Sequence, residues 1–349
     1  MIDYLIVGGG IAGLCFAELC LQNSKCIIVI SDDSQNSSRI AGGLYNPVIL
    51  KRFTGLEDAS EQLDFLDQFY SQIEERTGTK INFPLPLLRK FFSIEEQNNW
   101  FIAADHPKMA PFLSTKICVK NIPGIDAPFN YGQVLRTGYL DTAVFLDSYH
   151  AFLAKESLLH KESFDHSKLI VEEDCVKYGD IVAKKIIFAE GFGIHNNPFF
   201  NFLPLDGTKG ELFVIKAPDL KLDDIINTSV FILPLGNDLF KVGATYNWKD
   251  KTDLPTDEGR EELISRIKEI LHCDFEIVEH YAGVRPTVKD RKPLLGNHEM
   301  HRNLFILNGL GTRGVMLGPY AANILFQFAE NKKEIPLHYS IDRFKKKKF

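Results

Sequence analysis

The sequence predicts an α/β protein in which a domain built on a parallel sheet is interrupted by a second, α+β domain with a mostly antiparallel sheet. Two observations indicate the first domain. The chain opens with an apolar run, a glycine-rich turn and a helix-like segment, and runs typical of buried strands return at 185–191 and 303–307. A third observation indicates the second domain, because residues 203–280 hold apolar runs separated by turns such as Gly236-Asn237-Asp238, a pattern typical of antiparallel strands.

The first element is the apolar, β-branched run 2–7, followed by Gly8-Gly9-Gly10-Ile11-Ala12-Gly13 and a helix predicted over 11–21. A G-x-G-x-x-G sequence between a strand and a helix directs backbone N–H groups and a helix N-terminus toward a pyrophosphate. Gly8 permits the tight turn, Gly10 lets the backbone approach the phosphates, and Gly13 lets the helix lie close to the strand. The pattern predicts a dinucleotide site; the alternative is a glycine-rich turn that serves only packing.

The second strand, predicted over 26–30, should end on an acidic residue that binds the ribose. That position holds Ser31, with Asp32 and Asp33 directly after it. Two interpretations stay open. Either Ser31 or Asp32 contacts the ribose, or both aspartates are solvated turn residues.

The remaining elements follow in order along the chain. Residues 88–137 are expected to hold strands and irregular chain. Helices are predicted at 56–76, 142–154, 257–271 and 319–330, and further strands near 169–171, 181–183, 211–215, 230–233, 239–243 and 276–282. This order predicts a discontinuous first domain (1–85, 138–202 and 281–349) and a second domain made of 86–137 and 203–280.

Bulk composition excludes several classes of protein. The chain has 349 residues, 45% of them hydrophobic, and a net charge of −6, which does not favour a nucleic-acid partner. The basic run 345–348 is interpreted as a solvated tail. The six cysteines form no CxxC and no metal-ligand spacing is present, so we expect free thiols, no metal and a cytoplasmic location. No signal peptide and no membrane span are expected.

Seven segments then occur in an order that resembles a known family: GGGIAGL, SSRIAGGL, GYLD, IIFAEG, FKVGATY, GVRP and NGLGTRGVMLGP. Together they resemble the FAD-dependent oxidoreductases of the D-amino-acid oxidase superfamily, and among these glycine oxidase and monomeric sarcosine oxidase. The resemblance covers nearly the whole chain apart from 56–137. It implies an FAD-binding Rossmann-like domain and an enzyme that oxidises the C–N bond of a small amino acid or N-alkylated amino acid. Hydride would pass to flavin N5, giving an imine that hydrolyses.

The resemblance also implies which residues contact the cofactor. Residues Gly8, Gly10 and Gly13 would hold the pyrophosphate, and Phe164 would lie in a strand whose backbone meets the adenine. A loop beside the flavin, a strand end and the start of the last helix would supply the others: Ser38, Arg39, Ala41, Gly42, Gly43, Ala189, Gly191, Gly309, Gly311, Thr312, Arg313, Gly314 and Val315. No His or Cys matches a covalent attachment site, so the FAD is expected to be non-covalent.

Four residues match substrate-side positions. Arg285 matches the arginine that clamps a substrate carboxylate, with a structural salt bridge as the alternative. Arg313 matches a second arginine near the site; its alternative is a bridge to a phosphate or a loop carbonyl. Lys241 matches a lysine that lies over the flavin and favours reaction with oxygen, although one strand lysine more often faces solvent. Tyr246, which follows in the same predicted strand, would line the substrate pocket.

Two other functions remain open. The segments AGGLYNP, GLGTRG and IPLHYSIDRF also resemble the flavin domain of the bifunctional enzyme that modifies a carboxymethylaminomethyl group on the tRNA wobble uridine. The acidic balance and the lack of a fused methyltransferase count against this. The third candidate is a non-catalytic flavin-binding subunit or sensor. The substrate and the electron acceptor, oxygen or a quinone, are not fixed by the sequence.

Overall fold

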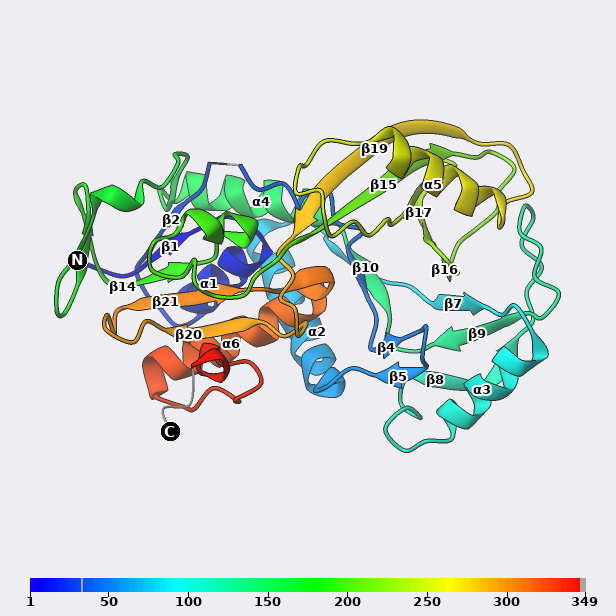
Figure 1. The fold of residues 1–349 in the computed structure, drawn as a ribbon, viewed down its shortest axis with the longest axis horizontal. Helices are drawn as coiled ribbons and strands as arrows, with labels where there is room; N and C mark the ends of the chain where they lie inside the picture. Colours follow the sequence, from blue (N-terminus) through cyan, green and yellow to red (C-terminus); the bar gives the residue numbers. More distant parts are fainter. Residues whose placement is uncertain (33, 346–349) are drawn as a thin grey trace.

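Two sheets organise the protein, and the computed structural model describes residues 1–32 and 34–345. Figure 1 shows one sheet with its helices on one side of the molecule and the second sheet on the other. The long strands β15 (Thr208–Lys216) and β19 (Glu276–Arg285) run from the second sheet toward the first. Asp33 and residues 346–349, which include most of the basic run, lie outside the described residues.

The first sheet is parallel at its centre, as predicted. Its parallel strands, in spatial order, are β11 (Leu159–His160), β2 (Ile27–Ile30), β1 (Ile2–Val7), β14 (Ile181–Phe188) and β21 (Leu304–Asn308). Antiparallel strands extend it, namely β20 (Leu294–Asn297) beside β21, and β13 (Val176–Tyr178) and β12 (Leu169–Val171) beside the first half of β14. The two strands predicted at 181–183 and 185–191 are therefore one continuous strand.

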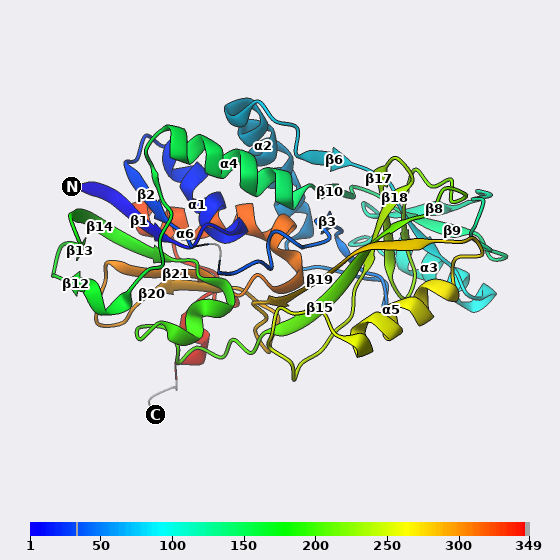
Figure 2. The same ribbon diagram turned by 90° about the horizontal axis from the view of Figure 1, so that it is seen from above.

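Alternate residues of β1 enter two separate cores, because successive side chains of a strand point to opposite faces. Tyr4 and Ile6 face helices, whereas Leu5 and Val7 face the other side of the sheet. The helices α1 (Ile11–Gln22) and α6 (Gly314–Asn331) pack on each other against this first face, with α2 (Ala59–Thr77) and α4 (Thr142–Lys155) behind them. Figure 2 shows the four helices gathered on one side of the sheet.

Helix α6 begins five residues before the predicted start at Pro319. A proline inside a helix removes one N–H and leaves the carbonyl four residues earlier without its usual donor. Here that carbonyl belongs to Val315, and the hydroxyl of Tyr70 on α2 donates to it at 2.8 Å. A contact between two helices thus compensates for the proline, which sequence position alone does not reveal.

The second sheet is mostly antiparallel, as predicted. Its order is β19-β15-β18-β17-β16-β7-β9-β8, and only the β16–β7 pair is parallel among its described strands. The strands not yet defined are β7 (Leu87–Lys90), β8 (Leu113–Cys118), β9 (Tyr131–Val134), β16 (Ile225–Asn227), β17 (Phe231–Gly236) and β18 (Leu239–Gly243). Helix α5 (Asp257–Lys268) covers it through Leu263 and Ile267. The residue boundaries between the two domains remain a prediction.

One further helix and several short elements complete the fold. Helix α3 (Ile94–Ala104) lies in the segment expected to be strands and irregular chain, so that expectation was wrong there. The small elements are β3 (Leu44–Tyr45), β4 (Val48–Ile49), β5 (Thr54–Gly55), β6 (Asn82–Pro84), β10 (Gly138–Leu140), η1 (His166–Lys168), η2 (Gly191–Asn196), η3 (Gly311–Arg313) and η4 (Ile341–Phe344). Among the described residues, no helix has the length and apolar character that crossing a bilayer requires.

Candidate active site

A cavity of about 1520 Å³ lies where the parallel strands end and the second sheet begins. Its lining includes Val7, Ile30, Ala189 and Asn308, which lie at the carboxyl ends of β1, β2, β14 and β21. Open α/β sheets bind ligands at this edge. Ligand pockets commonly measure roughly 300–1,000 Å³, so this cavity has room for a large cofactor together with a second molecule.

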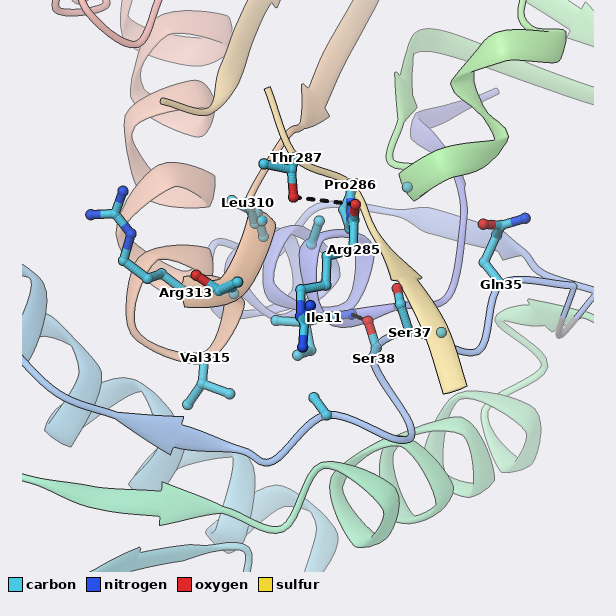
Figure 3. A pocket seen from close by; sticks show the side chains of 18 of the residues that line it. Ile11, Gln35, Ser37, Ser38, Arg285, Pro286, Thr287, Leu310, Arg313 and Val315 are labelled. Carbon is cyan, nitrogen blue, oxygen red and sulfur yellow. Dashed lines mark hydrogen bonds between the residues drawn. The ribbon is translucent and has the colours of Figure 1, made fainter. Parts of the chain in front are cut away.

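The glycine-rich turn forms one wall of the cavity. Gly8 has a φ of +110°, and a Cβ there would lie 2.3 Å from the carbonyl oxygen of Ala189. Helix α1 begins beside it, with no acidic residue in its first turn. The N–H of Ile11 donates to Oγ of Ser38 at 3.2 Å, and Figure 3 shows these two residues side by side. Gly8, Gly10 and Ser38 all line the cavity, so a helix N-terminus and bare backbone face it.

Gly13 does not line the cavity among the described residues. A Cβ on Gly13 would lie 1.9 Å from the carbonyl oxygen of Gly8. Its position therefore supports the packing role expected for it, in which the helix lies close to the strand and turn.

Ser31 and Asp32 line the same cavity beyond the end of β2. The Asp32 carboxylate accepts hydrogen bonds from Oγ of Ser163 at 2.6 Å and from the N–H of Ser34 at 2.9 Å. Burial alone would raise the pKa of Asp32, but these hydrogen bonds outweigh it and lower the pKa. Asp32 is therefore an ionised carboxylate, fixed by two hydrogen bonds, at the place where a ribose is expected.

Phe164 also lines this end of the cavity, but it lies in the loop between β11 and η1. The expectation that it lies in a strand was wrong. Its ring stacks on Tyr178 at a centroid distance of 4.4 Å. The neighbouring His166 lies with Nε2 2.8 Å from Oε1 of Glu190, and both residues line the cavity. Neither was identified from the sequence.

The other expected cofactor residues gather around the same cavity. Arg39 lines the cavity and forms a bidentate ion pair with Asp147, with its shortest distance 2.6 Å. Helix α6 begins at the cavity, which Gly314 and Val315 line, and it has neither an acidic residue in its first turn nor a capping side chain. Its positive N-terminal end therefore faces the cavity. The remaining lining residues from the expected set are Ala41, Gly42, Gly43, Ala189, Gly191, Gly309, Gly311, Thr312, Arg313, Gly314 and Val315.

Arg285, the last residue of β19, points into the cavity (Figure 3). Its Nη1 donates to the carbonyl oxygen of Thr245 at 3.3 Å, and its guanidinium lies 4.6 Å from the ring centre of Tyr246. Burial lowers its pKa, and no carboxylate among the described residues pairs with it. A structural salt bridge therefore does not explain this partly buried cation within the described chain.

Arg313 lines the cavity from η3 and points away from Arg285 in Figure 3. Its Nη2 donates to the carbonyl oxygen of Arg291 at 2.9 Å. This contact is the loop-carbonyl bridge that the sequence left open as an alternative. Burial is the main cause that lowers its pKa, and Arg291 lowers it further.

Lys241 and Tyr246 lie differently with respect to the cavity. Tyr246 lines it and is 60% exposed. It lies beyond the end of β18 at Gly243, so the expectation that it belongs to the same strand as Lys241 was wrong. Lys241 is not among the described lining residues; its Nζ donates to the carbonyl oxygen of Ala41, which does line the cavity, at 3.3 Å. Burial lowers the pKa of Lys241. A place over the flavin ring remains a prediction for this residue.

Thr208 is a cavity residue that the sequence analysis missed. It lies directly opposite Arg285 in the β15–β19 register, and its buried hydroxyl has no hydrogen-bond partner among the described residues. Gly210 and Leu212 line the cavity from the same face of β15. The two-residue spacing of Thr208, Gly210 and Leu212 is the signal that would have identified this face.

The residues present fit an FAD group. Three features support this fit. The turn at Gly8 has no room for a Cβ, two helices begin at the cavity without acidic residues in their first turns, and the carboxylate of Asp32 lies near the end of β2. No cluster of three or more His, Cys, Asp or Glu residues suited to a metal ion occurs in the described part of the chain.

Comparison with known proteins gives the family. The sequence family described as "FAD dependent oxidoreductase" matches residues 3–327. The glycine oxidase of Bacillus subtilis (strain 168) is 24% identical over 223 residues, which cover 59% of this chain and 60% of that protein. A tRNA 5-methylaminomethyl-2-thiouridine biosynthesis bifunctional protein, MnmC, from Marinobacter nauticus is 26% identical over 352 residues, covering 92% of this chain and 54% of that protein. The chain thus spans less than two thirds of the length of these relatives.

The fold agrees with a solved structure. The glycine oxidase of Geobacillus kaustophilus superposes with a TM-score of 0.75 at 18% identity, covering 96% of both chains. The family match spans most of the chain, and the family is one of FAD-dependent oxidoreductases. The chain belongs to the FAD-dependent oxidoreductases of the D-amino-acid oxidase superfamily.

Proposed function

We propose that the protein oxidises the C–N bond of a small amino acid or N-alkylated amino acid. The observation that carries this proposal is the guanidinium of Arg285, which lies partly buried in the cavity without a carboxylate partner among the described residues. A buried charge is costly unless it is paired, and a guanidinium matches the two oxygens of a carboxylate. A substrate carboxylate would supply the missing partner.

The residues around Arg285 would position the substrate. Tyr246 supports one side of the guanidinium, and the carbonyl of Thr245 fixes one of its nitrogens. The hydroxyl of Thr208, which has no hydrogen-bond partner in the part of the chain that the structure describes, lies on the strand directly opposite. When bound, FAD supplies the hydride acceptor. The carbon beside the amine would lose a hydride and the nitrogen a proton, which gives an imine. Water would then add to the imine and split it into a carbonyl compound and either ammonia or, for an N-alkylated substrate, an amine. Such chemistry needs orientation more than a general base.

A second candidate is oxidation of a carboxymethylaminomethyl group on tRNA. It is supported by the MnmC match, which is 26% identical over 92% of this chain. The electron acceptor is proposed to be oxygen or a quinone.

The six cysteines are free thiols. This agrees with the cytoplasmic location that we propose.

Anaerobic titration of the FAD-loaded protein tests the proposal. Glycine, sarcosine, D- and L-alanine and methylamine are added in turn while the flavin absorbance is followed. Carboxylated amines should bleach the flavin, and methylamine, which lacks the carboxylate, should not. Arg285→Ala should weaken binding of the carboxylated substrate about tenfold to a hundredfold, since a hydrogen bond to a charged group contributes roughly 1.5–3 kcal/mol.

FAD content is the control for this variant and should not change, because Arg285 is proposed to bind the substrate and not the cofactor. Equal affinity in the variant and the wild type, or equal use of methylamine and glycine by the wild type, would overturn the assignment of Arg285. Bleaching only by a nucleoside that carries a carboxymethylaminomethyl group would favour the second candidate.

A further inference from the structure

Strand β15 carries two buried charged residues that the proposed chemistry does not use. Lys209 is fully buried, and Glu211 is buried two residues further along the strand. They alternate with Thr208, Gly210 and Leu212, which line the cavity, so the two charges lie on the opposite face of the strand. Burying a charge is costly unless it is paired and hydrogen-bonded, so the partners of these two residues show what they hold in place.

The ammonium of Lys209 binds three residues of a single loop, which runs from 245 to 256 between β18 and α5. Its Nζ donates to the carboxylate of Asp250 at 2.5 Å, to the hydroxyl of Thr252 at 3.2 Å and to the carbonyl oxygen of Leu254. A lysine ammonium has three N–H donors, so each of them has an acceptor here. The hydrogen bond from Lys209 is the main cause that lowers the pKa of Asp250 to about 2, so this carboxylate is ionised at neutral pH.

Glu211 holds the two ends of the same loop. Its backbone carbonyl accepts from the N–H of Thr245 at 3.1 Å, and its own N–H donates to Oγ1 of Thr245 at 2.9 Å. Its carboxylate accepts bonds from the N–H and the Oγ1 of Thr256, at 3.0 and 2.7 Å. One residue of the strand thus fixes the first and last residues of the loop, and Lys209 holds the part that returns between them.

The other contacts of the loop are weaker. No residue between 246 and 256 belongs to a hydrophobic core in the part of the chain that the structure describes. The backbone of Asn247 exchanges two hydrogen bonds with that of Lys209, both at 2.9 Å. Two further contacts join side chains that are partly or fully exposed, namely Lys251 with Asp206 at 3.0 Å and Asn36 with Asp253 at 3.3 Å. Because exposed pairs contribute little, the buried ammonium of Lys209 is the main anchor of the returning half of the loop.

The same loop carries groups that hold Arg285. The carbonyl oxygen of Thr245 accepts a hydrogen bond from Nη1 of Arg285 at 3.3 Å, and the ring centre of Tyr246 lies 4.6 Å from the guanidinium. Tyr246 and Trp248 line the cavity, and both side chains are exposed, so their own burial does not fix the loop. The loop therefore connects the buried charges behind β15 to the arginine at its front.

We infer that Lys209 is a positioning residue for substrate binding, and that its ammonium acts by holding the 245–256 loop. With the loop held, Thr245 and Tyr246 keep Arg285 where it can bind a carboxylate. This inference rests on the proposed function, in which Arg285 binds the carboxylate of the substrate. Replacing a buried ion pair with well-packed apolar residues often preserves stability or raises it, so the position that the pair imposes explains it better than stability does.

Binding measurements on the FAD-loaded protein test this role. Lys209→Met removes the ammonium and keeps a long, unbranched side chain. The dissociation constants of acetate, glycine and sarcosine should rise about fivefold to tenfold, because a displaced guanidinium loses part of a charge-assisted contact. The limiting rate of flavin reduction by the two amines and the FAD content should change much less, because Lys209 does not line the cavity among the described residues. Calorimetry measures acetate, and anaerobic flavin absorbance measures the amines.

The fluorescence of Trp248 reports on the loop itself. The chain has two tryptophans, and the other, Trp100, is fully buried. Quenching by acrylamide, a neutral molecule, should increase in Lys209→Met, because the released loop exposes Trp248 further. Adding Trp248→Phe to the variant should remove this increase, which assigns the signal to the loop.

Two further variants complete the test. Lys249→Met is the matched control, because Lys249 is an exposed lysine of the same loop that does not line the cavity. It should leave both the dissociation constants and the quenching unchanged. Asp250→Ala removes the partner of Lys209 at a partly exposed position, so it gives the same test even if Lys209→Met does not fold. It should also weaken binding, and in combination with Lys209→Met it should add little.

The outcomes separate this inference from the proposed function. If the amines reduce the flavin and acetate binds, but Lys209→Met and Asp250→Ala bind them as tightly as the wild type, the positioning role is wrong and the proposed function stands. Loss of FAD, or weaker binding without a change in Trp248 quenching, would also overturn the positioning role. If neither amine reduces the flavin and acetate does not bind, the proposed function fails and this inference fails with it, even if the quenching of Trp248 rises.

Discussion

A Cβ atom on Gly210 would lie 1.9 Å from Nη2 of Arg285 and 2.1 Å from its Cζ. The guanidinium therefore occupies the space that a side chain at position 210 would fill. In the β15–β19 register Arg285 pairs with Thr208, two residues before Gly210 on the same face of β15. The Arg285 side chain thus lies along β15, and the missing side chain of Gly210 determines where its charge sits in the cavity.

Gly210→Ala should displace the charge of Arg285 without removing it. The displaced atoms are the far end of a flexible side chain, so we expect the fold to persist with a modest loss of stability, about 1–2 kcal/mol at most. Affinity for a carboxylated amine should fall nearly as far as in Arg285→Ala, about tenfold or more. Anaerobic titration of the flavin absorbance measures this affinity, and thermal melting reports the stability.

A double-mutant cycle is the control for this prediction. In the Arg285→Ala background no guanidinium is left to displace, so adding Gly210→Ala should change the affinity little. An effect of Gly210→Ala that is equally large with and without Arg285 would show that the glycine acts independently of the arginine.

The fold was largely predictable because its signals are local. Buried parallel strands such as 2–7, and the glycine turn after them, carry their pattern within a few residues. Helix α6 shows the limit. Its first turns contain Pro319, and the carbonyl released by that proline is bonded by Tyr70 from another helix. A compensation between residues 245 positions apart in the chain leaves no local pattern.

The candidate site, like the fold, was only partly predictable from the sequence. Glycines and arginines inside motifs were found, and almost all of them line one cavity. Thr208, His166 and Glu190 were missed, because their places depend on strand register and on the approach of distant loops. Lys241 shows the converse: its motif was recognised, but its Nζ points to the carbonyl of Ala41, in a loop 200 positions earlier in the chain.

The FAD is expected to be released intact when the protein unfolds. No His or Cys of the sequence matches a known attachment position, and the cavity holds the expected site through backbone groups and hydrogen bonds. Heating or acid precipitation of the yellow protein should leave FAD in the supernatant, identified by its absorbance and mass. Flavin that stays with the denatured chain would contradict non-covalent binding.

Lys241→Met should slow reoxidation of the reduced enzyme by oxygen by about two to three orders of magnitude, since one preorganised charged donor contributes roughly 3–4 kcal/mol. Flavin reduction by substrate should change much less. Burial lowers the pKa of Lys241 from 10.5, so the wild-type reoxidation rate should fall with rising pH already below 10.5, and that fall should be missing in the variant. Stopped-flow kinetics measures both half-reactions.

Lys216→Met is the matched control, because Lys216 is an exposed lysine on the neighbouring strand β15. It should leave both half-reactions unchanged. Loss of FAD from Lys241→Met without slower reoxidation would instead assign Lys241 to holding the loop at Ala41.

Glu330 near the end of α6 should make the folded state sensitive to acid. Burial alone would raise its pKa, but hydrogen bonds from Lys185 (2.7 Å), Lys25 and Tyr4 (2.5 Å) lower the pKa from 4.5 to about 2. A carboxyl group with a lowered pKa stabilises the folded state above pH 4.5, and this contribution disappears as the pH falls toward 2. Glu330→Gln should therefore reduce the free energy of unfolding by ~2–3 kcal/mol at pH 7 and by much less near pH 2.5.

Thermal melts across this pH range measure the difference. Glu334→Gln is the control, because it changes an exposed carboxylate with no ion pair in the described chain, and it should leave the free energy of unfolding unaltered at both pH values. An equal loss for Glu330→Gln at pH 7 and at pH 2.5 would mean that the glutamine is tolerated poorly for its packing, and that the charge of Glu330 does not stabilise the junction between α6, β1 and β14.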